Sequence, residues 1–341
     1  MKSTSKLGRP RVLIVGCGDV GMRCIPLLRQ RFRVFAMTRD TSRIAVLRQA
    51  GAVAVPADLD TRRSLGRIAA LAPSILHLAP PPANGLTDAR TQALLAALGA
   101  HRAALRGRQG RTRSIAAGRR PARLTGQMRR RAVLHNFDIV PERSSRAGMP
   151  VLAYGSTSGV YGDCGGAVVV ETRTPQPANP RALRRVSAER QLRQAGARGA
   201  VSVRIIRIPG IYAADRLPLE RLKSGTPALC AADDVFTSHI HADDLAAIMC
   251  RALWHGRPQR IIHAADDTRV KMADYFDLVA DAYHLPRPTR ITRAQAEQAL
   301  SPTLLSFMRE SRQLDNTRLK RELRIKLRYP GVADFLGARL R

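Results

Sequence analysis

Lysine, acidic residues and aromatic residues are all scarce in this chain of 341 residues. The 58 basic residues are 52 arginines and only 6 lysines, against 26 acidic residues, and the formal net charge is +32 at pH 7. A protein that has evolved to hold nucleic acid usually mixes both cations, so we interpret the arginine excess as a compositional bias. Such a charge still attracts polyanions non-specifically. Composition therefore disfavours nucleic acid as a partner without excluding it.

Cysteine is also scarce, and long hydrophobic runs are missing. The five cysteines are scattered and odd in number, with no C-x-x-C pair and no metal-ligand cluster with histidine. We therefore expect reduced thiols, a cytoplasmic location and no metal site. No stretch approaches the ~18 apolar residues that a membrane helix needs, so we expect no membrane span. Residues 1–11 are polar, so we expect no signal peptide.

The chain contains enough apolar sequence, 45% of its residues, for two domains or one large α/β unit. Strand-like and helix-like segments alternate, which predicts an α/β fold with a doubly wound parallel, Rossmann-like sheet. The expected strands are 11–15, 33–37, 52–55, 74–79, 151–156, 202–208 and 260–264. The expected helices lie near 20–30, 41–50, 61–71, 86–99, 180–195, 243–254, 272–284, 293–299 and 316–323.

Residues 101–150 break this alternation. They hold 13 arginines against Asp138 and Glu142 and show no clean periodicity. Structureless connections longer than about 12–15 residues are uncommon inside compact domains, so we expect a basic, mobile insertion. It could serve as a nucleic-acid arm or as a lid over the site. It could also be a tolerated surface insertion or a stretch translated from a shifted reading frame.

The most informative segment is VLIVGCGDVG at 12–21, in which an apolar strand leads through glycines into an amphipathic helix. This is the start of a dinucleotide-binding unit. Gly16 permits the tight turn, Gly18 lets the backbone approach a pyrophosphate, and Gly21 lets the helix pack on the strand. We expect Gly16, Gly18, Asp19, Val20 and Gly21 to contact the nucleotide, with the Asp19 carboxylate facing solvent or capping the helix. The alternative is a glycine-rich turn without a ligand.

The second expected strand ends in Thr38, Arg39 and Asp40, about 20 residues past the glycines, where the ribose is read. An acidic residue there suits the 2′-hydroxyl of NAD, and an arginine suits the 2′-phosphate of NADP. Because Arg39 comes first and Arg43 follows one helical turn later, we expect NADP, with NAD possible. Asp40 is then expected to cap the next helix. Thr38 and Arg39 are the candidate ribose contacts.

Four later segments extend the pattern. They read VLAYGSTSGVYGD at 151–163, RIIRIPGIYAADR at 204–216, SHIHADDLA at 238–246 and ESRQLDNTRLKREL at 310–323. Together with GCGDVG, and in this order, they resemble the extended and atypical short-chain dehydrogenase/reductase superfamily, in its NAD-dependent epimerase/dehydratase group. The resemblance covers nearly the whole chain except 101–150.

This resemblance implies a division of the chain and a set of site residues. Residues 1–210 would form the coenzyme domain and 211–341 a smaller α/β substrate-binding region, with 238–264 returning to the first domain. Thr157 aligns with the family's catalytic Ser/Thr, and its hydroxyl would orient a substrate oxygen beside the nicotinamide. The residues implied to contact the coenzyme are Asp58, Leu59, Ala79, Pro80 and Pro209.

One departure from the family pattern concerns its acid/base pair, Tyr-x-x-x-Lys. The aligned positions hold Arg181 and Arg185, eight and four residues before Glu189. Arginine stays protonated and cannot shuttle a proton as a tyrosinate does. Tyr161 is the best substitute, and Tyr154 and Tyr212 are weaker ones.

The two arginines could instead hold an anionic substrate. Arg181, Arg185 and Tyr212 are therefore candidate substrate contacts.

Three functions follow as hypotheses. The first is an NAD(P)-dependent oxidoreductase or epimerase/dehydratase-like enzyme acting on a small molecule. The second, favoured by the lost tyrosine, is a nucleotide-binding protein without efficient catalysis, acting as a sensor or an assembly factor. The third is a nucleic-acid-associated protein that uses 101–150. The sequence leaves open the substrate, the reaction direction and the oligomeric state.

Overall fold

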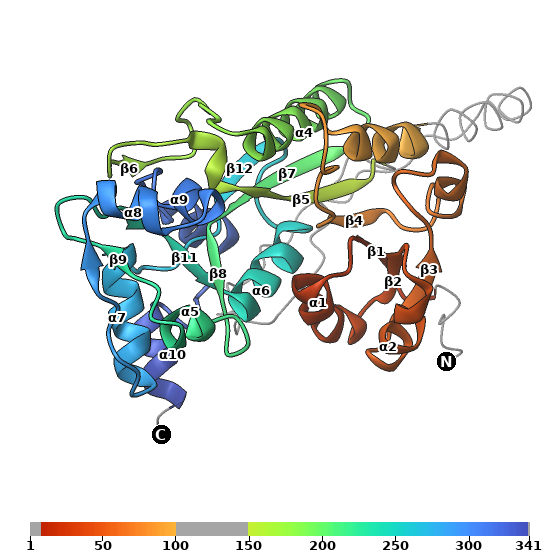
Figure 1. Ribbon diagram of the computed structural model, residues 1–341. Helices are drawn as coiled ribbons and strands as arrows, with labels where there is room; N and C mark the ends of the chain where they lie inside the picture. The colour runs from red at the N-terminus through yellow and green to blue at the C-terminus, as the bar shows by residue number, and fades with distance from the viewer. Residues whose placement is uncertain (1–7, 100–148, 340–341) are drawn as a thin grey trace, which may run out of the picture.

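The computed structural model describes residues 8–99 and 149–339. A seven-stranded parallel sheet lies at its centre (Figure 1), with the strand order β12-β7-β5-β4-β1-β2-β3. Its strands are β1 (Arg11–Val15), β2 (Arg33–Thr38), β3 (Val53–Pro56), β4 (Ser74–His77), β5 (Val151–Thr157), β7 (Ser202–Ile208) and β12 (Arg260–His263). The strand order reverses between β1 and β4, which confirms the predicted doubly wound sheet and marks where such folds bind ligands.

Helices cover both faces of this sheet. One face carries α1 (Asp19–Arg29) and α6 (Ala242–Ala252), and the other carries α4 (Pro180–Ala197) and the helix over 89–99 (Figure 1). Along β1, alternate side chains enter the two cores, Val12 and Ile14 on the α1 side and Leu13 and Val15 on the α4 side. All four are fully buried, as expected for a strand covered on both faces.

The C-terminal part forms a smaller unit with its own apolar core, at the left of Figure 1. Its helices are α5 (Leu219–Lys223), α7 (Met272–Ala282), α8 (Arg293–Ala299), α9 (Pro302–Phe307) and α10 (Val332–Arg339). Four two-stranded sheets accompany it: β8 (Gly210–Tyr212) with β11 (His239–His241), β9 (Ala228–Leu229) with β14 (Arg290–Ile291), β10 (Phe236–Thr237) with β13 (Val270–Lys271), and β6 (Val168–Val169) with β15 (Gln313–Leu314). Because β12 joins the large sheet and α6 packs on α1, the chain returns to the first unit there.

Some elements differ from expectation. The helix expected at 61–71 is a short 3-10 helix, Arg62–Arg67, and the one expected at 316–323 is a single π-helical turn, Leu319–Leu323. After β2, the expected helix is a 3-10 turn, Thr41–Arg43, followed by α2 (Ile44–Gln49). The basic insertion at 101–150 falls almost wholly outside the described residues. Its mobility, its role and the domain boundaries stay predictions.

Candidate functional site

The turn after β1 depends on a glycine. Gly16 has φ +86°, and a Cβ placed on it would lie only 2.3 Å from the backbone nitrogen of Ala79. The carbonyl of Val15 accepts hydrogen bonds from the amides of Leu78, at 2.8 Å, and Ala79, at 3.0 Å. These two bonds draw the chain after β4 against the turn and end β4 at His77 rather than at residue 79. Only glycine allows the two segments to meet so closely.

The other two glycines shape the start of α1. A Cβ on Gly18 would meet no atom within 4 Å, so the backbone there is open to a ligand. A Cβ on Gly21 would lie 3.2 Å from Cys17 Sγ, which reflects its close packing on the turn. Gly18 is the N-cap residue of α1, and no side chain caps the helix. Unpaired amides and the positive end of the helix dipole therefore face the opening.

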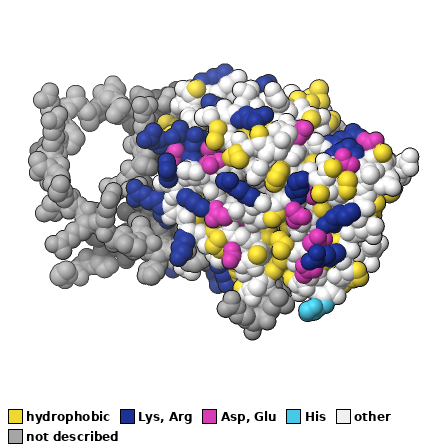
Figure 2. All heavy atoms as spheres, turned by 90° about the vertical axis from the view of Figure 1, so that its left-hand side faces the viewer, with side chains coloured by type: hydrophobic (Ala, Val, Ile, Leu, Met, Phe, Trp, Pro, Cys, Tyr) yellow, Lys and Arg dark blue, Asp and Glu magenta, His cyan; other side chains and the backbone are white. Residues whose placement is uncertain are grey.

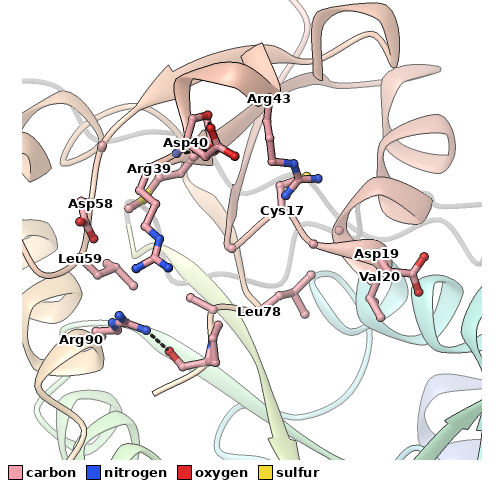
Figure 3. A pocket seen from close by; sticks show the side chains of 18 of the residues that line it. Cys17, Asp19, Val20, Arg39, Asp40, Arg43, Asp58, Leu59, Leu78 and Arg90 are labelled. Atoms are coloured by element: carbon pink, nitrogen blue, oxygen red, sulfur yellow. Dashed lines mark hydrogen bonds between the residues drawn. The ribbon is translucent and has the colours of Figure 1, made fainter. Parts of the chain in front are cut away.

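A pocket of about 480 Å³ lies at this turn, at the carboxyl ends of β1, β2 and β4 (Figure 3). We call it the glycine-turn pocket. Its lining residues are Gly16, Cys17, Gly18, Asp19, Val20, Gly21, Met37, Thr38, Arg39, Asp40, Arg43, Ala57, Asp58, Leu59, Leu78, Ala79, Pro80, Arg90 and Arg216. The structure thus brings together every expected coenzyme contact except Pro209. That these residues bind a coenzyme stays a prediction.

The end of β2 places cations, rather than a free carboxylate, at the pocket wall. The Asp40 carboxylate accepts hydrogen bonds from the Ser42 hydroxyl, at 2.6 Å, and from the Ser42 amide, at 2.9 Å. Both bonds lower the pKa of Asp40, and they hold the carboxylate in the cap position that the sequence predicted. Figure 3 shows the Arg39 side chain extending across the pocket, with Arg43 on the Cys17 side.

Two further lining residues had no sequence signal. Arg90 donates from Nε and Nη2 to the Asp60 carboxylate, at 2.8 and 2.5 Å, and from Nη1 to the carbonyl of Pro80, at 3.1 Å. The bonds to Asp60 lower its pKa, and the bond to Pro80 braces the pocket rim. Arg216 comes from the loop after β8. Both arginines lie far from the glycine turn in sequence, so spacing could not assign them.

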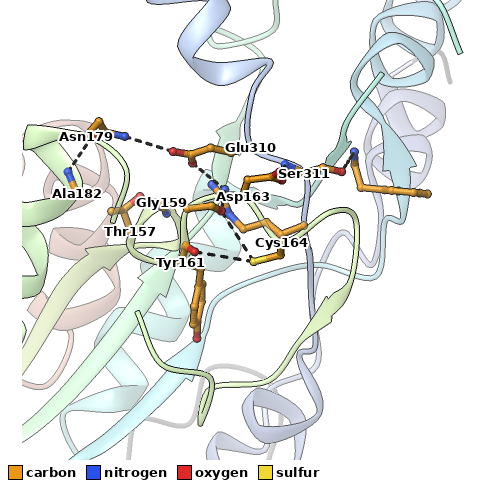
Figure 4. A network of polar contacts seen from close by, with 12 residues as sticks. Thr157, Gly159, Tyr161, Asp163, Cys164, Asn179, Ala182, Glu310 and Ser311 are labelled. Carbon is orange, nitrogen blue, oxygen red and sulfur yellow. Dashed lines mark hydrogen bonds and ion pairs between the residues drawn. The ribbon is translucent and has the colours of Figure 1, made fainter. Parts of the chain in front are cut away.

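Thr157 ends β5, and its hydroxyl accepts a hydrogen bond from the amide of Gly159 at 3.2 Å. A Cβ on Gly159 would lie 3.6 Å from Thr157 Oγ1 and 4.0 Å from Glu310 Oε2, so both side chains face one small space. Glu310 in turn accepts hydrogen bonds from Asn179, at 3.3 Å, and Arg312, at 2.7 Å (Figure 4). Sequence reasoning missed Glu310, which is far from Thr157 along the chain.

Tyr161 points into the protein interior. Its side chain is buried, and its hydroxyl lies 2.5 Å from Nε2 of His263. Burial raises the pKa of Tyr161 to about 12, and the Arg207 guanidinium lies over its ring. To give a proton to a substrate, this hydroxyl would have to leave His263. The catalytic role expected for Tyr161 stays a prediction. It would require breaking the buried hydrogen bond to His263.

The other candidate substrate contacts are dispersed. Arg185 donates from Nη1 to the Tyr154 hydroxyl, at 3.0 Å, and to the carbonyl of Gly155, at 2.8 Å. Arg181 is exposed in the first turn of α4. The Tyr212 ring is buried in the core of the smaller unit, and burial raises its pKa. The structure therefore does not bring these three side chains into one cluster.

Three further features of the described residues concern metal sites, disulfide bonds and membrane-spanning helices. Among residues 8–99 and 149–339, no group of three or more His, Cys, Asp or Glu side chains could hold a metal ion. All five cysteines are free thiols. In the part of the chain that the structure describes, no helix is both long and apolar enough to cross a membrane.

Comparison with known proteins gives a likeness of fold. No family model matches the chain. No curated protein matches it. A functionally unknown conserved protein from Silicibacter pomeroyi superposes with a TM-score of 0.69 and 24% identity, covering 96% of this chain and 97% of the other. A UDP-glucose 4-epimerase with UDP-glucose from Thermotoga maritima superposes with a TM-score of 0.67 and 15% identity, covering 97% of this chain and 100% of the other.

A UDP-glucuronic acid 4-epimerase from Bacillus cereus in complex with NAD gives a TM-score of 0.66 and 14% identity, covering 96% of this chain and 94% of the other. The chain therefore shares its fold with these solved structures over nearly its whole length. At the level of fold, this confirms the resemblance drawn from the sequence motifs.

Proposed function

We propose that the protein is an NADP-dependent oxidoreductase or epimerase-like enzyme that exchanges hydride between nicotinamide and a carbonyl or alcohol carbon of a small molecule. One observation carries this proposal. Segments from β1, β2, β3 and β4, far apart in sequence, converge on a single pocket at the topological switch point of the sheet. This is where doubly wound folds bind dinucleotides.

The pocket residues fit a dinucleotide with a 2′-phosphate. The open backbone at Gly18 and the amides at the start of α1 would hold the diphosphate. Arg39 and Arg43 would hold the 2′-phosphate, while Asp40 is engaged by Ser42. A similar fold that holds NAD, in the Bacillus cereus epimerase, supports a nicotinamide coenzyme. The choice of NADP rests on the two arginines.

The chemistry would take place at the end of β5. A bound nicotinamide supplies or accepts the hydride. The Thr157 hydroxyl would donate a hydrogen bond to the substrate oxygen while it accepts one from Gly159. Glu310 lies near the same space and could exchange a proton there only if it left Asn179 and Arg312, as Tyr161 could only if it left His263.

Gly18 offers a sharp test of the proposal. A Cβ there would meet no atom within 4 Å, so the fold should accept a valine, whose side chain would fill the space through which a diphosphate would approach. We expect Gly18→Val to abolish binding of NADPH and NADH in a fluorescence titration. Gly66→Val is the matched control, because Gly66 also has open space around it and lies outside the pocket. Wild-type protein that is folded and binds neither nucleotide would refute the proposal.

A second function is favoured by Arg185. This residue occupies the position of the family's lysine, but its guanidinium is engaged by Tyr154 and Gly155. A protein that binds coenzyme without turnover, as a sensor or an assembly factor, fits this arrangement. Screening carbonyl substrates for loss of NADPH absorbance separates the two functions. Coenzyme binding without any turnover would favour the second.

A further inference from the structure

A second cavity of about 640 Å³ lies beside β12, at the edge of the sheet opposite β3, between α4 and the segment 171–175. We call it the arginine pocket. It shares no lining residue with the glycine-turn pocket. The basic residues that line it are Arg173, Arg190, Arg193, Arg207, Arg260 and Arg318. Among the described residues that line it, two are acidic, Glu171 and Glu189.

Both of these carboxylates are already engaged. Glu189 accepts hydrogen bonds from Arg207 Nη2, at 2.6 Å, and from the Ser156 hydroxyl, at 2.6 Å. Glu171 lies 3.5 Å from Arg318 Nε and accepts a bond from the amide of His263 at 3.3 Å. Neither carboxylate is therefore available to neutralise the remaining cations of the pocket.

Three of the lining arginines keep uncompensated charge. Within residues 8–99 and 149–339, Arg173, Arg190 and Arg193 form no ion pair with Asp or Glu. Elsewhere exposed arginines do find such partners, as in the pair between Arg287 and Asp281 at 2.8 Å. On the face of the molecule in Figure 2, basic side chains lie beside acidic ones in several places. Arg173, Arg190 and Arg193 thus bring three positive charges, unpaired among the described residues, together at one pocket.

Arg207 lies in the wall of the arginine pocket. Its side chain is 2% exposed, and its Nε and Nη2 bind Glu189. Its Nη1 is buried and has no hydrogen-bond partner among the described residues. Because Glu189 balances the charge of Arg207 and its Nη1 is shielded from the cavity, Arg207 shapes the pocket wall, and the free positive charge comes from Arg173, Arg190 and Arg193.

We propose that the arginine pocket binds a small phosphorylated anion carrying a diphosphate or several phosphate groups. Guanidinium groups bind phosphate oxygens in pairs and remain charged at any working pH. Nucleic acid is the less suitable occupant. None of the described residues that line the pocket is aromatic, whereas single-stranded nucleic acid is held largely by stacking on aromatic rings. This site is independent of the proposed coenzyme site.

Calorimetric titration with inorganic pyrophosphate in 0.15 M salt tests the site, in the Gly18→Val background so that the glycine-turn pocket does not contribute. The triple variant Arg173→Gln, Arg190→Gln, Arg193→Gln should raise the Kd at least about tenfold, because three charge-assisted contacts are lost. All three side chains are exposed, so the fold should tolerate the change. Orthophosphate should bind more weakly than pyrophosphate, because it engages fewer arginines.

The matched control removes the same charge elsewhere. Arg48, Arg62 and Arg63 are also exposed and line neither pocket, and their change to glutamine should alter the Kd less than about twofold. Three outcomes would overturn the proposal. These are no pyrophosphate binding at millimolar concentration, an equal loss in the control triple, or tighter binding of a single-stranded oligonucleotide that the same triple abolishes.

Discussion

Arg216 Nη1 lies 3.0 Å from Asp19 Oδ2, and this ion pair joins the loop after β8 to the first turn of α1. Both residues line the glycine-turn pocket. Asp19 also accepts a bond from Arg23 Nε, at 2.9 Å, and Arg23 reaches Asp243 and Asp215 as well. The carboxylate at the start of α1 is therefore neutralised from two sides. A diphosphate bound at the same helix end would compete with Asp19 for Arg216.

The first prediction concerns this competition. Arg216→Gln should weaken NADP⁺ binding about 3- to 30-fold, the range expected for one partly exposed charge-assisted contact. It should leave the binding of 2′-AMP unchanged, because 2′-AMP carries the 2′-phosphate but no diphosphate. Calorimetry with both ligands measures the difference, and Arg287→Gln, remote from the pocket, is the control. Equal losses for the two ligands would show that Arg216 acts on the fold instead.

The second prediction concerns coenzyme choice. Arg39→Ala should lower the affinity for NADPH at least about tenfold and leave that for NADH nearly unchanged, because only NADPH carries the 2′-phosphate. Fluorescence titration of both nucleotides gives the ratio. Arg62→Ala serves as the control, since it removes an exposed cation outside the pocket. If NADH and NADPH lost affinity equally, Arg39 would not read the 2′-phosphate.

Much of the fold and of the glycine turn can be predicted from local sequence. The apolar run at Val12–Val15 is followed by glycines, and strand geometry alone then dictates two buried faces and a tight turn. The same holds for Asp40, whose cap position follows from its place just before a helical turn. These features depend on neighbours along the chain, so one sequence suffices to predict them.

Contacts between residues that are far apart in sequence cannot be predicted in this way. Asp60 and Arg90 meet because a 3-10 turn and a helix after β4 converge. Thr157 and Glu310 both come near Gly159 because the chain returns late to the end of β5. Tyr161 shows a related limit. Its spacing from Thr157 predicts a residue at the sheet edge, but the 3-10 turn Ser158–Tyr161 turns its hydroxyl inward onto His263.

The third prediction separates the structural and catalytic roles of Thr157. Thr157→Val removes the acceptor for Gly159 and should lower the free energy of unfolding by about 1 kcal/mol, as for other lost caps. Thr157→Ser keeps the hydroxyl and the cap. If the hydroxyl also orients substrate, kcat should fall about 100-fold in Thr157→Val but little in Thr157→Ser, while NADPH affinity stays unchanged. Turnover untouched by Thr157→Val would remove Thr157 from the mechanism.

The fourth prediction concerns two neighbouring carboxyl groups with opposite environments. Asp266 is 4% exposed, and burial raises its pKa from 3.8 to about 7. Asp267 is more exposed. Burial alone would raise its pKa, but hydrogen bonds from Asn316, at 2.7 Å, and Lys320, at 2.5 Å, lower it below the ordinary value. The two groups should therefore make opposite contributions to the pH dependence of stability.

For Asp266 the folded state binds its proton more tightly than the unfolded state does. The contribution of Asp266 to stability is therefore lost as pH rises from about 4 to 7, and the loss then levels off. Asp266→Asn stays neutral throughout, so its free energy of unfolding should rise relative to wild type across this window, by at most about 4 kcal/mol. Asp267→Asn should be less stable than wild type at pH 7, with the difference vanishing once the pH has fallen below the lowered pKa of Asp267. Urea unfolding at each pH measures both, and a profile for Asp266→Asn parallel to wild type between pH 4 and 8 would contradict the raised pKa.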